Sequence, residues 1–248
     1  MEAQRLEIMV LSIIIPAHNE EESIVDVITG IESSLEIPHE LIVVNDHSAD
    51  RTAELVRVLA KKYPAIQLVS NPGKKGFAEA VKSGLSQAHN ELIVFIMADS
   101  CDDTQSIKAM LKKIGEGYDV VCGSRYIKGG ARIGGSRVKG FFSFLAGISM
   151  FHLTGIPTHD VVNTFKMYRK SVLDSIEMRA ASFEISMELS LRAYYAGFKV
   201  TEVPTVWKER KKGKSSFNLL KLFPKYLRFY LWAIARRWEL NKQRRGKG

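Results

Sequence analysis

Several features that define common protein classes are missing from this 248-residue sequence. Its two cysteines, Cys101 and Cys122, lack the spacing of a metal site and cannot build a disulfide framework, which is typical of a reducing cytoplasm. No run reaches the roughly 18 uncharged apolar residues of a membrane-spanning helix. We expect no secretory signal, because Met1–Glu7 has no basic segment followed by an apolar core. The absence of a GxGxxG fingerprint and of a Walker A motif argues against dinucleotide dehydrogenases and P-loop enzymes.

What the sequence does contain is an ordinary globular composition with an uneven distribution of charge. The hydrophobic fraction of 46% is enough for a substantial core, in one large α/β domain or two small ones. Of the net charge of +9, residues 208–248 carry +12, from 14 basic residues against two acidic ones, whereas residues 1–207 carry −3. We therefore expect a nearly neutral body over 1–207 and a basic segment over 208–248. A basic segment of this kind meets an anionic membrane or a nucleic acid.

Apolar runs typical of buried strands alternate with segments of helical periodicity, which predicts an α/β fold with a parallel sheet and right-handed crossovers. The predicted strands are Met9–Ile15 (stopped by Pro16), Glu40–Val44, Ile66–Val69, Leu92–Met97, Tyr118–Cys122, Val161–Tyr168 and Lys199–Val203. The predicted helices are one capped by Asn19 and reaching Leu35, one capped by Ser48 or Asp50 and reaching Lys62, then Gly76–Ala88, Thr104–Glu116, Phe141–Phe151 and Glu184–Ala196. Between them, residues 123–135 form a glycine-rich, basic loop.

Polar residues follow three of the predicted strands at the point where each strand ends. They are Pro16-Ala-His-Asn-Glu20, Asn45-Asp46-His-Ser and Asp99-Ser-Cys-Asp102-Asp103. Each of these segments, taken alone, is better explained as a simple helix cap or a turn. Together they predict a crevice at the carboxyl ends of parallel strands, where α/β proteins bind ligands. Carboxylates there suit a divalent ion, and we expect a site for a metal and a nucleotide.

In their order and spacing, these segments resemble the family 2 glycosyltransferases of GT-A fold, and within them the dolichyl-phosphate mannose synthases and related polyprenyl-phosphate sugar transferases. The resemblance runs from Ile13 to about Arg237. Its remaining elements are Lys74-Lys-Gly-Phe-Ala-Glu-Ala80, Ala98-Asp99, Gly123-Ser-Arg-Tyr126, Glu202-Val-Pro204 and Arg210-Lys-Lys-Gly213-Lys-Ser215. It implies a single GT-A domain over 1–207 with a mostly parallel sheet. The implied reaction is an inverting transfer of a hexose, mannose or glucose first, from a GDP- or UDP-linked donor to a polyprenyl phosphate.

The resemblance also implies roles in nucleotide-sugar binding at the matching positions. Asp46 would hold the base or ribose, Gly76 would let the backbone approach the nucleotide, and Lys74 would lie near its phosphates. His18 stands where the family usually has tyrosine, so a stacking ring is kept and a hydroxyl is lost; a structural role for this histidine is equally open. The other implied positions are Pro16, Ala17, Glu20, Asn45 (in place of a frequent aspartate), Ala98 and Asp99.

The metal motif of the family is incomplete in this sequence. The family pattern is Asp-x-Asp followed by a further polar residue, whereas this chain has Met97, Asp99 and Cys101 at those places. We expect Asp99 to hold Mg²⁺ or Mn²⁺ and favour Asp102 as its partner, because a thiol is a poor ligand for these ions. Asp103 either compensates as well or caps the next helix.

An acceptor phosphate needs cations rather than a general base, because a monoester phosphate is already an anion at neutral pH. Two basic loops contain six candidate cations, of which the resemblance favours Arg125 and Arg210 and then Arg137 and Lys214, ahead of Arg132 and Lys139. Solvated loop charges are the alternative explanation for each. Two further hypotheses remain open. A hydroxyl acceptor would require Asp102 or Asp103 as a base, and the missing acid at Met97 would fit a non-catalytic nucleotide-sugar-binding scaffold.

The C-terminal segment Leu219–Trp238 has the pattern of a basic amphipathic helix. Leu219, Phe223, Leu227, Tyr230, Ile234 and Trp238 fall on one face, and Pro224 begins or kinks the helix. Basic residues beside tryptophans indicate a membrane-surface anchor, with a core helix that closes the domain as the alternative. We therefore expect a peripheral protein on the cytoplasmic membrane face, with no nucleic-acid partner.

Overall fold

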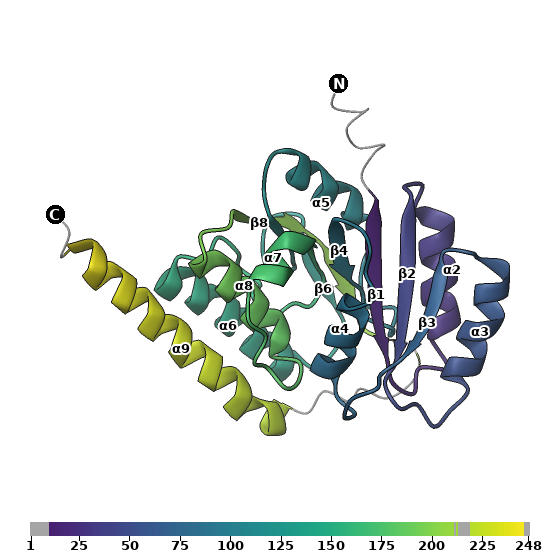
Figure 1. The fold of residues 1–248 in the computed structure, drawn as a ribbon. Coiled ribbons are helices and arrows are strands. Elements are labelled where there is room, and N and C mark those ends of the chain that lie inside the picture. The colour runs from purple at the N-terminus through teal and green to yellow at the C-terminus, as the bar shows by residue number, and fades with distance from the viewer. Residues whose placement is uncertain (1–9, 211, 213–218, 246–248) are drawn as a thin grey trace.

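A computed structural model of the chain describes residues 10–210, 212 and 219–245, in which helices cover both faces of a central sheet (Figure 1). The strands are β1 (Leu11–Ala17), β2 (His39–Asn45), β3 (Ile66–Ser70), β4 (Leu92–Phe95), β5 (Val120–Ser124), β6 (Ala131–Ile133), β7 (Lys166–Arg169), β8 (Val200–Pro204) and β9 (Val206–Lys208). The helices are α2 (Ile24–Ser34), α3 (Thr52–Lys62), α4 (Phe77–Leu85), α5 (Ser106–Gly115), α6 (Arg137–Thr154), α7 (Lys170–Ser175), α8 (Ile185–Tyr195) and α9 (Leu219–Arg245).

Seven strands form the main sheet in the order β3-β2-β1-β4-β7-β5-β8. All neighbours pair in parallel except β7, which runs antiparallel to both β4 and β5. The short strands β6 and β9 pair in parallel as a second, separate sheet. The α/β class and the mostly parallel sheet predicted from the sequence are therefore confirmed.

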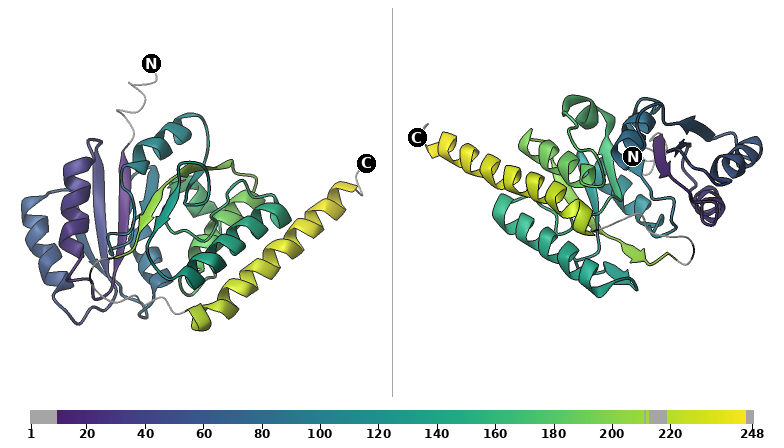
Figure 2. Two further views of the ribbon diagram at one scale, coloured as in Figure 1. Left: turned by 180° about the vertical axis from the view of Figure 1, so that it is seen from behind. Right: turned by 90° about the horizontal axis from the view of Figure 1, so that it is seen from below.

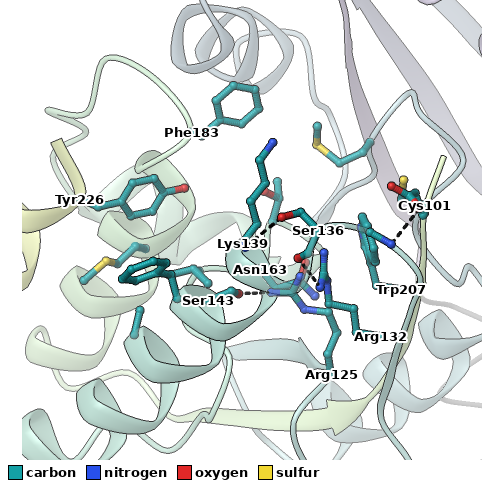
Figure 3. Close-up of a pocket in the computed structure, with 18 of the residues that line it drawn as sticks. Cys101, Arg125, Arg132, Ser136, Lys139, Ser143, Asn163, Phe183, Trp207 and Tyr226 are labelled. Carbon is teal, nitrogen blue, oxygen red and sulfur yellow. Dashed lines mark hydrogen bonds between the residues drawn. The ribbon is translucent and has the colours of Figure 1, made fainter. Parts of the chain in front are cut away.

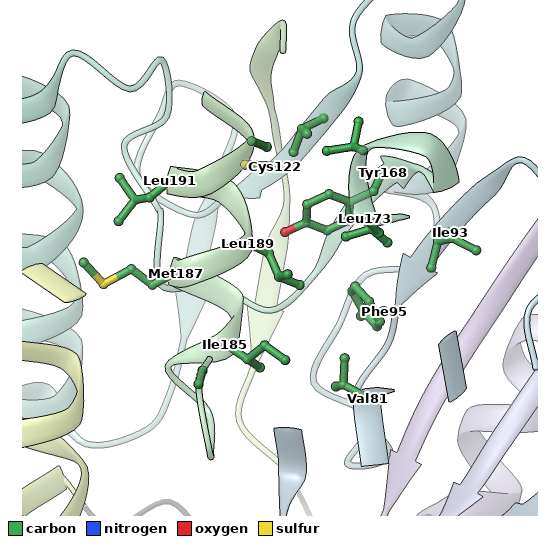
Figure 4. Packing of buried hydrophobic residues seen from close by; sticks show 14 of the residues in the cluster. Val81, Ile93, Phe95, Cys122, Tyr168, Leu173, Ile185, Met187, Leu189 and Leu191 are labelled. Carbon is green, nitrogen blue, oxygen red and sulfur yellow. The ribbon is translucent and has the colours of Figure 1, made fainter. Parts of the chain in front are cut away.

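Alternating side chains along each strand divide the core into two layers. On β1, Ile14 packs with α4 and α8 on one face of the sheet, while Ile13 and Ile15 pack with α2, α3 and α5 on the other. Figure 4 shows the first layer around Tyr168 and Phe95, whose rings meet edge to face at 5.8 Å. All of these side chains are at most 3% exposed, so the sheet is buried on both faces, as parallel sheets usually are.

Helices α6 and α9 lie side by side at one end of the molecule, and α9 also contacts α8 (Figure 2). Phe229 and Ala233 of α9 belong to the same buried core as the sheet. Gly147 of α6 lies so close to the carbonyl of His159 that a side chain there would overlap it. The C-terminal helix α9 packs on the domain through the face that contains Phe229 and Ala233. Within the described ranges, no helix combines the length and the apolar character needed to cross a membrane.

Two sequence predictions at the start of the chain are wrong in detail. Pro16 lies inside β1 rather than ending it. The amide of Ile96, just after β4, donates to the carbonyl of Ile14, so the polar groups of Ile14 face β4. Those of Pro16, two residues later, face the same side, where the pairing of β1 with β4 has already ended. The amide hydrogen that proline lacks is therefore not needed there. Asn19 does not cap a helix, because α2 begins only at Ile24.

Other boundaries differ because tertiary pairing outweighs local pattern. The strand expected over Val161–Tyr168 is the shorter β7, and the expected loop over 123–135 contains β6. The helix expected over Phe141–Phe151 extends over the whole of α6. Helix α7 and strand β9 were not predicted at all. The expected start of the first strand at Met9 lies outside the described residues.

Candidate active site

The carboxyl ends of β2, β1 and β4 lie next to one another, and the sheet changes its order of connection between β1 and β4. The loops that leave these three strands each contain a residue with a left-handed backbone, namely Asn19 (φ 54°), His47 (φ 54°) and Ser100 (φ 60°). No other non-glycine residue with positive φ occurs in the part of the chain that the structure describes. Because this conformation costs energy and concentrates at functional sites, the three loops mark the crevice as the candidate site.

Side-chain to backbone hydrogen bonds hold the loops after β1 and β2 together. The amide of Ala49 donates to Oδ1 of Asn19 at 2.8 Å, and the amide of Glu20 donates to Oγ1 of Thr52 at 2.9 Å. The Asn19 side chain therefore ties two loops together. The wall of the crevice is held in place before any ligand binds.

Asp46 lies at the base of the crevice and is only 5% exposed. Its Oδ1 accepts from Nδ2 of Asn71 at 2.7 Å, and its Oδ2 accepts from the amide of Gly76 at 2.9 Å. This carboxylate fastens the ends of β2 and β3 to the start of α4. The same loop places Lys74 on the surface beside the crevice. Asn45 uses its side chain locally, accepting from the amide of Ser48 at 3.3 Å.

His18 is held by both of its ring nitrogens. Nδ1 lies 2.7 Å from the carbonyl oxygen of Asp46, which can only accept, so Nδ1 carries the proton. Nε2 then accepts from Nδ2 of Asn19 at 3.2 Å. The structure thus brings Pro16, Ala17, His18, Asn45 and Asp46 to one crevice wall, as the sequence predicts, while the contact of each with a nucleotide stays a prediction.

Across the crevice, Arg210 bridges two of the predicted carboxylates. Its Nη2 lies 2.8 Å from Oε1 of Glu20 and 3.4 Å from Oδ2 of Asp99. The other oxygen of Glu20 accepts from Oγ of Ser23 at 2.9 Å. Arg210 follows β9, which brings it next to the end of β1, although Glu20 lies 190 residues away in the sequence, and next to the end of β4. A guanidinium in this position balances part of the negative charge of the site.

The loop after β4 turns Asp102 back towards Met97. Oδ2 of Asp102 accepts from the Met97 amide at 2.9 Å, and Oδ1 of Asp99 accepts from the Cys101 amide at 3.1 Å. Burial, together with the charge of Asp99, raises the pKa of Asp102 to about 7. Burial and the charge of Asp99 also raise the pKa of the Cys101 thiol, so this thiol is protonated at neutral pH.

These groups fit a divalent ion that is also bound by phosphate. Mg²⁺ in nucleotide sites takes one or two carboxylates, and substrate phosphates and water complete its coordination. Asp99 and Asp102 supply two hard oxygen ligands, and the pKa of Asp102 is raised first by burial and then by the charge of Asp99, both of which a bound cation would offset. The described residues contain no group of three or more histidines, cysteines or acids that could hold an ion on its own. Cys101 is buried, and its soft thiol is a poor ligand for Mg²⁺ or Mn²⁺, which prefer oxygen.

A cavity of about 560 Å³ leads from this acidic cluster to the gap between α6 and α9 (Figure 3). Asp99, Asp102 and Arg210 line one end of the cavity, and Arg125, Arg132 and Lys139 line its middle. The far end is apolar, lined by Phe142, Leu145 and Ala146 of α6 and by Phe223, Leu227 and Tyr230 of α9. The cavity thus changes from anionic to cationic to apolar along its length.

Arg125 is neutralised by a buried acid. Its Nε and Nη2 bind the carboxylate of Asp160 at 2.6 and 2.8 Å, and Nη2 also donates to Oγ of Ser143 on α6 at 2.9 Å. Asp160 in addition accepts from the Arg125 backbone amide at 3.0 Å. The adjacent carboxylate raises the pKa of Arg125 above its ordinary value. The pair fixes the guanidinium as part of the cavity wall.

For binding the acceptor phosphate, the sequence favoured Arg137 over Arg132 and Lys139, and the positions of these three residues do not follow that order. Arg132 and Lys139 line the cavity, whereas Arg137 is exposed and does not. Lys214, the other favoured cation, lies outside the described residues. Trp207 also lines the cavity and was not predicted, because the short strand β9 that carries it has no distinctive pattern.

Comparisons with known proteins identify the family and the fold. The family model "Glycosyl transferase family 2" matches residues 12–177. The "Dolichol-phosphate mannosyltransferase" of Pyrococcus furiosus is 32% identical over 225 residues, a match that covers 89% of this chain and 62% of that protein. The "Polyprenol monophosphomannose synthase" of Mycolicibacterium smegmatis is 27% identical over 213 residues, which cover 83% of this chain and 80% of the relative.

Among solved structures, glucosyl-3-phosphoglycerate synthase from Mycobacterium tuberculosis, in complex with Mn²⁺, UDP and glucosyl-3-phosphoglycerate, superposes with a TM-score of 0.68. It is 20% identical, and the match covers 94% of this chain and 83% of that one. Staphylococcus aureus TarS, in complex with UDP-GlcNAc, gives a TM-score of 0.69 at 18% identity over 92% of this chain and 69% of its own. At these identities the likeness concerns the fold.

Proposed function

The chain belongs to glycosyl transferase family 2, and from this premise we propose that it transfers a hexose, mannose in the first place, from a nucleotide-diphosphate sugar to a polyprenyl phosphate at a membrane surface. The observation that carries the proposal is the cavity, which joins an acidic cluster to an apolar groove through a set of cations. The names of the two curated relatives support mannose and a polyprenyl phosphate. This chain spans 62% of the length of the first of them, so the activity of that whole protein is a proposal here.

The donor nucleotide is assigned to the crevice wall formed by Pro16–His18, Asn45 and Asp46. The hydrogen bonds of Asp46 to Asn71 and Gly76 fix the position of this wall. His18 presents a ring whose orientation is set by Asp46 and Asn19. A preformed pocket of this kind binds without the entropic cost of ordering its loops.

Asp99 and Asp102 are the proposed holders of Mg²⁺ or Mn²⁺, with the donor's phosphates completing the site. When bound, the ion neutralises charge that develops on the departing diphosphate. The chain itself contributes Arg210, which contacts Asp99 and Glu20 and lies where it can donate to the same phosphates. Asp102 supplies the carboxylate next to position 97, where the family pattern has an aspartate and this chain has methionine.

The reaction we propose is a single displacement with inversion. An oxygen of the acceptor phosphate attacks the anomeric carbon, the new C–O bond forms as the bond to the nucleoside diphosphate breaks, and the diphosphate leaves with that electron pair. No base is needed, since the acceptor phosphate is already ionised at neutral pH. Those cations in the middle of the cavity that no buried carboxylate matches orient this phosphate, and the groove between α6 and α9 takes the first prenyl units.

The alternative of a hydroxyl acceptor has less support from the geometry. Its base would be Asp102 or Asp103. Asp103 accepts from the amide of Gln105 at 3.2 Å and from Oγ of Ser106 at 3.1 Å, so its carboxylate is used at the start of α5. Asp102 is proposed as a ligand of the metal ion, which leaves it unavailable as a base.

Helices α6 and α9 together are proposed as the membrane-binding face. Large apolar side chains are exposed along both, among them Phe141, Phe142 and Leu145 on α6 and Phe223, Leu227, Leu231 and Trp238 on α9. An exposed apolar patch of this kind marks an interaction site, and the flanking Lys221, Lys225 and Arg228 suit anionic lipid headgroups. The buried Phe229 and Ala233 lie on the opposite side of α9, so this helix combines the core and membrane roles considered from the sequence.

The test is a transfer assay with Mg²⁺ or Mn²⁺, polyprenyl phosphate and a panel of labelled GDP- and UDP-linked mannose and glucose donors. We expect label in the lipid phase from one donor. The matched acceptor control is the corresponding polyprenol, which lacks the phosphate and should take up none. Absence of transfer from every donor, with nucleotide binding intact, would support the non-catalytic hypothesis instead.

A further inference from the structure

Arg132 occupies a slot in the middle of the cavity wall (Figure 3). Its Nη1 donates to the carbonyl oxygen of Ser136 at 3.0 Å, and its guanidinium carbon lies 4.9 Å from the centre of the Trp207 ring. A backbone acceptor and an aromatic face therefore hold the side chain from two directions. An arginine held in this way loses less conformational entropy when it binds a ligand.

Two glycines make the room for this guanidinium. A side chain on Gly135 would overlap Nη2 of Arg132, and a side chain on Gly140 would overlap Nη1. Gly135 also has a left-handed backbone, with φ 76°, but Gly140 lies within the regular helix α6, where its backbone alone does not call for glycine. The absence of a side chain at Gly140 thus serves the placement of Arg132.

The slot lies at the positive end of α6. The first turn of this helix contains no acidic residue, although acids are favoured there, and it contains Arg137 and Lys139 instead. In the part of the chain that the structure describes, Arg132 forms no ion pair with an acid, whereas Arg125 is matched by Asp160. The neighbouring acid Glu209 uses its Oε2 to accept from the amide of Gly135 at 2.8 Å. Glu209 keeps its negative charge in this bond, but Arg132, Arg137 and Lys139 near the start of α6 outweigh it, and an anion would be stabilised there.

We propose that Arg132 is the cation that recognises the phosphate of the acceptor, a specificity role that rests on the proposed function. A polyprenyl monophosphate carries close to two negative charges at neutral pH, so it needs a cation that is not already matched by a carboxylate. The planar fork of a guanidinium binds phosphate oxygens in pairs, and the trapped position of Arg132 fixes where that phosphate sits. Arg137 is exposed outside the cavity and contributes only to the positive electrostatic potential around it.

The experiment measures direct binding by calorimetry, with farnesyl phosphate as a soluble prenyl phosphate, farnesol as its uncharged match, and inorganic phosphate. The variants are Arg132→Gln and, as a matched control, Arg137→Gln, which removes the same charge five residues away. We expect Arg132→Gln to weaken farnesyl phosphate binding by about 10- to 100-fold, the range for a lost hydrogen bond to a charged group. Arg137→Gln should change it by less than about threefold, and neither should change farnesol binding.

Gly140→Ala tests the slot without removing a charge. Alanine favours a helix more than glycine does, so α6 should form at least as well and Tm should stay the same or rise. The new methyl group displaces the flexible end of Arg132, so farnesyl phosphate should bind as weakly as it does to Arg132→Gln. Wild-type affinity in Gly140→Ala would contradict the slot.

The outcomes separate this inference from the proposed function. Transfer by wild type that Arg132→Gln leaves unimpaired, with unchanged affinity, overturns the role of Arg132 and leaves the proposed function standing. Binding that depends on Arg132 in a protein that transfers no sugar supports the phosphate site and counts against the proposed function. Equal losses of farnesyl phosphate affinity in Arg132→Gln and Arg137→Gln overturn the inference, because the phosphate would then respond to the summed positive charge of the region and not to Arg132 in particular. Inorganic phosphate binding as tight as farnesyl phosphate also overturns it, since the site would then serve free phosphate.

Discussion

Removing the acid that neutralises Arg125 should destabilise the protein strongly. Asp160 is fully buried, with 0% exposure of its side chain against 10% for Arg125, and it accepts three hydrogen bonds from that residue. In Asp160→Asn the guanidinium stays buried without a counter-charge. Loss of one partner of a buried pair costs about 3–5 kcal/mol. For a chain of this length that corresponds to a Tm lowered by about 6–20 °C.

An exposed ion pair of the same length is the matched control. Arg179 and Glu177 also meet at 2.6 Å, but their side chains are 57% and 61% exposed. We expect Glu177→Gln to leave Tm nearly unchanged, because water and salt screen such pairs. Differential scanning calorimetry and denaturant titration of both variants measure the contrast.

The double variant Asp160→Asn/Arg125→Gln completes the cycle. It replaces the pair by two neutral side chains and should recover part of the loss, because no unmatched charge remains. The reasoning is refuted if Asp160→Asn costs no more than Glu177→Gln, or if the double variant is no more stable than Asp160→Asn alone.

Three further predictions follow from other parts of the molecule. Asp99→Asn and Asp102→Asn should each abolish metal-dependent transfer and weaken the nucleotide-stimulated binding of Mn²⁺ measured by electron paramagnetic resonance. Asp103→Asn, at the start of α5, should keep both transfer and Mn²⁺ binding. Equal losses in all three variants would contradict the assignment. Leu231 is 57% exposed on α9, and Leu231→Ser should weaken binding to anionic vesicles about tenfold. Val58 is 59% exposed on α3, and Val58→Ser should leave vesicle binding unchanged. Equal sedimentation of both variants with vesicles would contradict the membrane face. Burial lowers the pKa of Lys166 to about 8, so from pH 8 to about 10 the unfolded chain holds a proton that the folded chain has lost. Over that range the unfolding free energy of wild type relative to Lys166→Met should rise by up to about 1.4 kcal/mol per pH unit, and a constant difference would refute the shifted pKa.

The fold and the family were predictable because they depend on features that a sequence displays directly. Buried parallel strands appear as apolar runs, and the polar segments at their ends mark the crevice. The family match and the central sheet confirm these predictions. The antiparallel course of β7 was not predictable, because it is set by pairing with β4 and β5 rather than by its own residues.

Details of the site depend on contacts between distant segments. Asn19 looks like a helix cap by its local sequence, but its side chain binds Ala49 of the next loop. Arg132 and Arg137 are equivalent by charge in a basic loop, and only the packing of Gly135, Gly140 and Trp207 distinguishes them. Glycines at those two positions are a usable signal, but only after the structure shows which side chain they accommodate.

The turn of Asp102 towards Met97 is a similar case. The missing acid was evident from the sequence, and Asp102 and Asp103 were both candidates to replace it. The sequence favoured Asp102, and the hydrogen bonds give a physical reason, since Asp102 accepts from the Met97 amide and Asp103 bonds to the start of α5. The spacing of two neighbouring aspartates does not predict which way each side chain turns.

The most direct test of the central claim is the structure of the product, determined by ³¹P and ¹H nuclear magnetic resonance after incubation with polyprenyl phosphate and the donor that the panel selects. The account predicts a hexose joined to the lipid through a phosphodiester, with the anomeric configuration opposite to that of the donor. A hexose on a hydroxyl group, or retention of the donor configuration, would contradict it.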